Sequence, residues 1–163
     1  MTRNVRQMVR AAVIGALYVV LTHLQNLIFP NSASMAIQFR ASEALCVLAF
    51  FTPAAIPGLT AGCLLFNLTF IGSLPLDFLV GTLATLGATA SMRLLRRLPF
   101  LGLLMPALWN AFLVGWELSV YIGGGFWLNA LYVAIGEAAV LLTLGTALYY
   151  ALKTRNLHTR LFS

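Results

Sequence analysis

Four carboxylates in a strongly apolar chain are the residues best suited to chemistry. Glu43, Asp77, Glu117 and Glu137 are all the acids in 163 residues, and each falls in or beside an apolar run. A charge at membrane depth costs about 2.5–3.5 kcal/mol or more on insertion scales, so such a residue needs a partner or a purpose. Carboxylates accept hydrogen bonds from N–H groups. The acids therefore predict a site for a small ligand rich in N–H groups, and its occupant is expected to be planar and cationic.

Other polar and aromatic residues align with these acids at helical spacing. Asn110 and Glu117 are seven residues apart and share a helix face, and two four-residue steps lead from Asn129 to Glu137. Indole rings can stack on a planar ligand. The candidate ligand-binding residues are Arg40, Glu43, Asn67, Asp77, Trp109, Asn110, Trp116, Glu117, Trp127, Asn129 and Glu137.

Structural roles remain open for part of this set. Arg40 and Glu43, one turn apart, could form a local ion pair, and Asp77 could be a charge favoured at a helix N-terminus. The three tryptophans could be interfacial or packing aromatics. Glu117 and Glu137 have no basic neighbour in sequence, which makes a functional role the stronger reading for them.

The composition places these residues in a membrane protein. Hydrophobic residues make up 61% of the chain and charged residues 9%, against about 45–50% and 25% in soluble domains. This excludes a soluble enzyme or a nucleic-acid-binding module, although the net charge is +6. Cys46 and Cys63 lie in apolar runs and are expected to be buried, unpaired thiols.

Six apolar runs predict an all-α integral membrane bundle, a single transmembrane domain over residues 1–163. Pro53 and Pro57 leave open whether the second and third runs meet at a turn or form a re-entrant segment. The predicted runs cover about residues 8–29, 41–51, 57–71, 76–92, 98–121 and 126–152.

The basic residues predict the orientation of this bundle. Six helices place both termini on one side, and the positive-inside rule makes that side cytoplasmic in a bacterial cell membrane. Arg40 is then the single basic residue of ten that lies outside. The nine cytoplasmic ones are Arg3, Arg6, Arg10, Arg93, Arg96, Arg97, Lys153, Arg155 and Arg160.

Motifs for catalysis or energy conversion are missing from the sequence. The run 123–125 of three glycines lacks the Lys-Ser/Thr of a phosphate-binding loop, and no zinc spacing or nucleophile motif occurs. We therefore expect no enzyme activity, metal or cofactor. Either the protein is a passive or ion-coupled carrier, or a partner supplies the energy.

Small residues on the first predicted helix offer a docking surface. Ala11 with Gly15, and Ala12 with Ala16, form overlapping pairs spaced four apart. Such pairs let helices approach closely in lipid. They predict either packing within the bundle or contact with a membrane partner.

Several segments resemble the QueT-type substrate-binding (S) components of energy-coupling factor (ECF) transporters. The most specific is Ile37-Gln38-Phe39-Arg40-Ala41-Ser42-Glu43-Ala44-Leu45. Weaker similarity covers Ile56-Pro57-Gly58-Leu59 with Gly62, Cys63 and Asn67, the stretch 77–85, and Trp109-Asn110-Ala111, so that the resemblance spans about residues 5–152.

The resemblance implies a function and a set of partners. The family fold would have six helices and an outward-facing site capped by the loop after the first helix. The protein would join a transmembrane coupling protein, which would contact Ala12 and Ala16, and two cytoplasmic ATPases. It would capture a queuosine precursor such as pre-queuosine, a 7-deazaguanine with an aminomethyl group. An S component for another small vitamin or base, and a small ion-coupled carrier using Glu137, are the alternatives.

Overall fold

The structure, a computed structural model, describes residues 2–30, 39–70 and 73–154. All the secondary structure in these ranges is helical, which confirms the predicted all-α fold. The tail with Arg155 and Arg160, and most of the loop expected to cap the site, lie outside the described residues. The elements are α1 (Arg3–Ile28), the 3₁₀ helix η1 (Ala41–Phe50), α2 (Ala55–Thr69), α3 (Asp77–Leu94), α4 (Pro99–Leu103), α5 (Met105–Tyr121), α6 (Phe126–Val140), the π-helical turn η2 (Leu141–Gly145) and α7 (Thr146–Thr154).

These elements form six helical segments with the predicted boundaries to within a few residues. Three of them are long and apolar enough to cross a membrane: Arg3–Ile28, Pro99–Tyr121 and Phe126–Thr154. The segments η1 and α2 are apolar but shorter. At a rise of about 2.0 Å per residue in a 3₁₀ helix, η1 is roughly 20 Å long, less than the ~30 Å hydrocarbon core.

One proline lies between two of the segments, and another interrupts a segment. Pro53 lies in a tight turn between η1 and α2, where the N–H of Thr52 donates to the Leu48 carbonyl and that of Ile56 to the Pro53 carbonyl. The second and third runs therefore meet at a turn. Pro106 lacks the N–H that would continue the helix from α4, and the chain bends at Leu104 before α5 begins.

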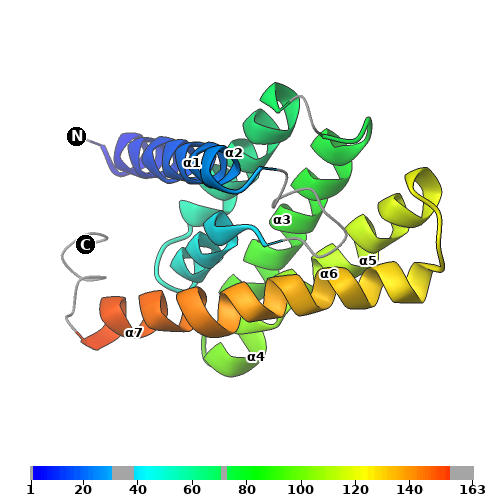
Figure 1. The fold of residues 1–163 in the computed structure, drawn as a ribbon. Helices are drawn as coiled ribbons and strands as arrows, with labels where there is room; N and C mark the ends of the chain where they lie inside the picture. Colours follow the sequence, from blue (N-terminus) through cyan, green and yellow to red (C-terminus); the bar gives the residue numbers. More distant parts are fainter. Residues whose placement is uncertain (1, 31–38, 71–72, 155–163) are drawn as a thin grey trace.

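The ends of several helices meet at one end of the bundle. The Arg93 guanidinium, near the end of α3, donates to the Phe50 carbonyl at 3.0 Å. The Tyr149 ring of α7 packs edge-on against the Phe50 ring, with 5.6 Å between centroids. The N-terminal end of α1 and the far end of α7 point to the same side of the molecule (Figure 1). An even number of crossings, as the six runs predict, produces this arrangement.

Helices α1 and α2 pack at backbone distance. A Cβ atom built on Gly15 would lie 2.7 Å from the Gly58 carbonyl oxygen, and one on Gly58 would lie 2.6 Å from that of Ala11. Only glycine allows this approach, so the small-residue pair Ala11 and Gly15 packs within the bundle. This contact fixes the position of Tyr18, whose Cβ would be 3.0 Å from a Cβ on Gly62.

Candidate ligand-binding site

The 3₁₀ geometry of η1 brings three chemistry-bearing side chains into one row. A 3₁₀ helix has three residues per turn, so that side chains three apart lie above one another. Arg40, directly before η1, Glu43 and Cys46 have this spacing, and the Cys46 thiol donates to Glu43 Oε2 at 3.2 Å. Arg40 and Glu43 are 6% and 1% exposed. The row therefore faces the interior of the bundle.

Tyr18 of α1 joins the two charged members of this row. Its hydroxyl donates to Glu43 Oε1 at 2.7 Å, and the Arg40 guanidinium donates to the same hydroxyl at 3.5 Å. The guanidinium also lies over the Phe66 ring, 5.6 Å from its centroid. Glu43 thus has partners on both carboxylate oxygens, which makes it the best-satisfied acid of the cluster.

Helix α1 supplies further polar groups on the same side. The Thr22 hydroxyl lies 2.6 Å from the Ser42 hydroxyl, and both residues are completely buried. One turn further along α1, the Asn26 amide donates to the Thr22 carbonyl, while its buried Oδ1 accepts no hydrogen bond from the described residues. A polar stripe of Tyr18, Thr22 and Asn26 therefore faces η1.

Asn67, Asp77 and Glu117 form a second group beside the row. The Asn67 amide donates to the Asp77 carbonyl at 2.8 Å, and the Asp77 carboxylate accepts the N–H of Leu74 at 2.6 Å. Glu117 is completely buried, and its charge interacts with those of Asp77 and Arg40. Neither of its carboxylate oxygens accepts a hydrogen bond from the described residues, and the same holds for the free oxygen of the Asn67 amide.

Glu137 of α6 is the remaining acid of the cluster. It is 2% exposed, and its charge interacts with those of Glu43 and Arg40. Its Oε2 is buried without a hydrogen-bond partner among the described residues. The helix continues four residues later into the π-helical turn η2, and such turns are frequent at functional sites.

The cluster is strongly unbalanced in charge. The cluster contains four acids and one arginine, which gives 4 − 1 = 3 excess negative charges when all are ionised. Buried charge without a partner is costly, and buried polar groups are normally hydrogen-bonded. Positive charge and N–H donors are the chemistry that these oxygens of Glu117 and Glu137 lack among the described residues.

Some predicted site residues lie elsewhere. Trp109, Trp116 and Trp127 are 40%, 48% and 76% exposed on the outer surface of the bundle. The Trp109 N–H donates to the Ser91 hydroxyl, and its ring fills the space beside Gly87. The structure therefore does not bring the three indoles to the carboxylates.

The two remaining amides differ in surroundings. The Asn129 amide donates to the Gly123 carbonyl and stabilises the turn before α6, where Gly123 and Gly124 have φ values of 87° and 83°. Asn110 is buried, and its Nδ2 has no acceptor among the described residues. Asn110 thus resembles the cluster residues, whereas Asn129 has a local structural partner.

Five polar residues that contribute to the cluster are not among the predicted site residues. Tyr18, Thr22 and Asn26 recur every four residues along an apolar helix, and this periodicity was the signal that could have revealed them. Ser42 and Cys46 could be assigned only once η1 was known to be a 3₁₀ helix.

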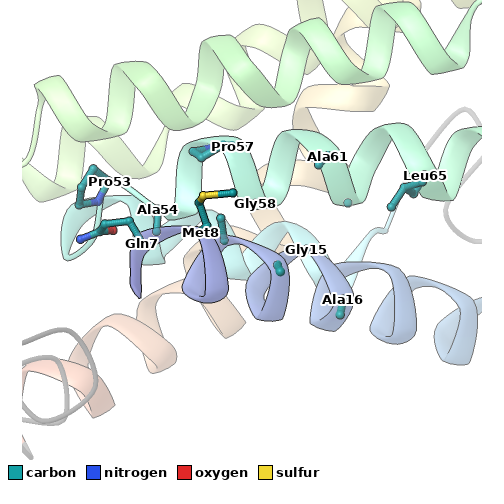
Figure 2. Close-up of a pocket in the computed structure, with 13 residues that line it drawn as sticks. Gln7, Met8, Gly15, Ala16, Pro53, Ala54, Pro57, Gly58, Ala61 and Leu65 are labelled. Carbon is teal, nitrogen blue, oxygen red and sulfur yellow. The ribbon is translucent and has the colours of Figure 1, made fainter. Parts of the chain in front are cut away.

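A groove between α1 and α2 opens on the outer surface of the bundle. It has a volume of about 710 Å³. Ala12 and Ala16 are exposed along it, whereas Gly15 is buried against α2. Figure 2 shows small and apolar side chains on both walls. The residues that line it are Gln7, Met8, Ala11, Ala12, Gly15, Ala16, Pro53, Ala54, Pro57, Gly58, Ala61, Gly62 and Leu65.

Comparison with known proteins identifies the family. Residues 8–154 match the QueT transporter family, and the chain therefore belongs to it. No curated protein sequence and no solved structure matches the chain. The chain thus belongs to a transporter family and contains several long apolar helices. It is therefore a multi-pass membrane protein.

Proposed function

We propose that this QueT family member is the substrate-binding component of an ECF-type importer, and that it captures a queuosine precursor from outside the cell. The observation that carries the proposal is the buried cluster of Arg40 and four acids, in which Glu117 and Glu137 have oxygens without hydrogen-bond partners among the described residues. Apolar helices rarely retain such groups without a ligand or a proton to bind.

Pre-queuosine matches the chemistry of this cluster. The guanine-like edge of a 7-deazaguanine presents adjacent N–H donors, which a single carboxylate can accept together. The aminomethyl group is a cation and would offset part of the excess negative charge. We assign Glu117 and Glu137 to the two ends of the ligand, and Asn67 and Asn110 to its polar edges. The carbonyl of the base can accept from Arg40.

The groove supports the second half of the proposal, assembly with a coupling protein. The exposed Ala12 and Ala16 lie one turn apart on the outer surface of α1, and helices associate in lipid through such pairs of small residues. Two cytoplasmic ATPases would supply the energy, since the chain contains no phosphate-binding loop motif. The basic residues at the helix ends would place both termini in the cytoplasm.

A binding assay on the purified protein alone tests the substrate. Pre-queuosine should raise the melting temperature without ATP or an ion gradient, with a stabilisation of about 2.7 kcal/mol at 100 times Kd. The neutral 7-cyano analogue should bind more weakly, because it lacks the cation. Tight binding of an unrelated vitamin, with no binding of any 7-deazaguanine, would contradict the substrate assignment and favour an S component of another specificity.

A transport assay separates the importer from an ion-coupled carrier. Buried Glu137 beside Glu43 is the arrangement that a proton-coupled carrier would use. In proteoliposomes that contain this chain alone, an importer subunit should show no uptake of pre-queuosine driven by a proton gradient. Uptake that follows the gradient would favour the carrier.

A further inference from the structure

Gln25, near the end of α1, contacts the backbone on both sides of Arg40. Its amide nitrogen donates to the Phe39 carbonyl, and its amide oxygen accepts the N–H of Ala41 at 2.6 Å. A side-chain amide carries one donor group and one acceptor, and here both are directed at the residues that flank a single position. The contact bridges sixteen residues of sequence, from α1 to the start of η1.

This contact replaces a helix cap that the local sequence lacks. The first N–H groups of a helix have no partner within the helix, and a short polar side chain usually accepts one of them. The residue before η1 is Arg40, which makes no capping hydrogen bond because a guanidinium has no acceptor, and its side chain instead donates to Tyr18. Gln25 satisfies the Ala41 N–H from another helix and leaves the Arg40 guanidinium available to Tyr18.

The backbone at Arg40 determines where the guanidinium lies. Arg40 has φ −112° and ψ 94°, an extended conformation directly before the first turn of η1. Phe39 is 46% exposed while Arg40 is 6% exposed, so the two neighbours point in opposite directions. A rotation of the flanking peptides would withdraw the arginine from Tyr18 and Phe66.

We propose that Gln25 is a positioning residue, which holds the peptides on both sides of Arg40 and thereby directs its guanidinium into the ligand-binding cluster. The inference deepens the proposed function and rests on it for the identity of the ligand. In this role Gln25 acts on ligand affinity through Arg40.

The first experiment needs no ligand. Hydrogen–deuterium exchange of the purified protein should show faster exchange at the Ala41 amide in Gln25→Ala than in the wild type. Gln25→Glu keeps the acceptor for Ala41 but loses the donor to Phe39, so it should give an intermediate rate. Ser91→Ala, which removes the hydrogen bond that the Trp109 N–H donates from α5 to α3, is the matched control and should leave this amide unchanged. Unchanged exchange in Gln25→Ala would overturn the proposal.

The second experiment measures affinity for pre-queuosine in a double-mutant cycle with Arg40→Lys. Gln25→Ala should weaken binding about tenfold in the wild-type background, the scale of one or two lost hydrogen bonds. In the Arg40→Lys background the same change should cost less than about twofold, because Gln25 acts through Arg40. An equal loss in both backgrounds would mean that Gln25 only stabilises the fold, and would overturn the positioning role.

The two experiments distinguish failure of this inference from failure of the proposed function. If the wild type does not bind pre-queuosine, the substrate assignment fails, while the exchange rate at Ala41 still decides whether Gln25 holds this backbone. If the wild type binds and the cycle is additive, the substrate assignment stands and the positioning role fails.

Discussion

The two halves of α1 make contact with the bundle in opposite ways. The N-terminal half, with Ala11 and Gly15, packs at backbone distance on Gly58 of α2 and has almost no polar side chains at the contact. The C-terminal half presents Tyr18 and Thr22, whose hydroxyls bond to Glu43 and Ser42. One part of α1 thus contacts the bundle through its backbone, and the other part contacts it through hydrogen-bonding side chains.

The difference teaches which half can serve a ligand and which can serve a partner. Close backbone packing at Ala11 and Gly15 gains dispersion contacts and involves no polar side chain, so this part of α1 is suited to contacts between helices and not to a polar ligand. The neighbouring polar cluster keeps buried oxygens on Glu117 and Glu137 without partners among the described residues. Such groups cost free energy in the empty protein and regain it when a ligand binds.

The largest effect on the purified protein is expected at the close helix contact. Gly58→Leu would place a side chain against the Ala11 backbone, which cannot move aside, and should destabilise the fold by about 3 kcal/mol or more. Gly125→Leu is the matched control, because a Cβ there meets nothing within 4 Å. Melting temperatures in detergent measure both; similar values for the two variants would show that α1 and α2 can separate without cost.

A smaller effect on stability should distinguish two acids of the cluster. Glu43→Gln removes the charge that accepts hydrogen bonds from Tyr18 and Cys46, and should cost about 2 kcal/mol, the value of a hydrogen bond to a charged group. Glu137→Gln removes a buried charge with an unsatisfied oxygen, and should change stability by less than about 1 kcal/mol.

The Glu137→Gln variant should also differ from the wild type in ligand affinity. Glu137→Gln should weaken pre-queuosine binding at least tenfold while the protein stays folded. Calorimetric titration and thermal unfolding of the same samples provide the comparison. A strongly destabilised Glu137→Gln with normal affinity would identify Glu137 as a structural residue.

Exposed alanines in the groove should affect assembly and leave stability nearly unchanged. Ala12→Leu with Ala16→Leu adds bulk on the outer surface of α1, where substitutions usually change stability by less than about 0.5 kcal/mol. We expect normal binding of pre-queuosine but no uptake by the reconstituted importer. Loss of binding in the double variant would mean that this side of α1 supports the cluster and does not contact a partner.

The smallest effect is expected at the outermost indole. Trp127 is 76% exposed and lies edge-on to Phe126. Trp127→Ala should change the affinity for pre-queuosine by less than about twofold, because the side chain has no contact with the carboxylates. Titration of this variant beside Glu137→Gln checks the assignment. A comparable loss of affinity in both variants would mean that the Trp127 indole belongs to the ligand-binding site.

The apolar runs and their interruptions were enough to predict the helices. Long apolar stretches between glycines, prolines and basic residues have few alternatives in a bilayer, where every backbone group must be satisfied within a helix. The same argument singled out Glu43, Glu117 and Glu137, since charge is rare in such stretches. It could not separate the buried Asn110 from Asn129, whose amide stabilises a turn.

Side-chain direction was the property that local sequence could not supply. Trp109 and Trp116 have the spacing of a helix face, but the packing of α5 turns that face outward. The 3₁₀ form of η1 was equally hidden, since it depends on what surrounds the segment, and it is what aligns Arg40, Glu43 and Cys46.

By itself, the sequence determined the membrane class, the number of helical segments and the acids that needed a purpose, because hydropathy and charge act residue by residue. Only the tertiary structure decided which small-residue pair of α1 is buried, which polar groups meet, and that Gln25 reaches across to Arg40. These contacts join residues that are far apart in the chain, and only the packing of helices against one another brings such residues within hydrogen-bond distance.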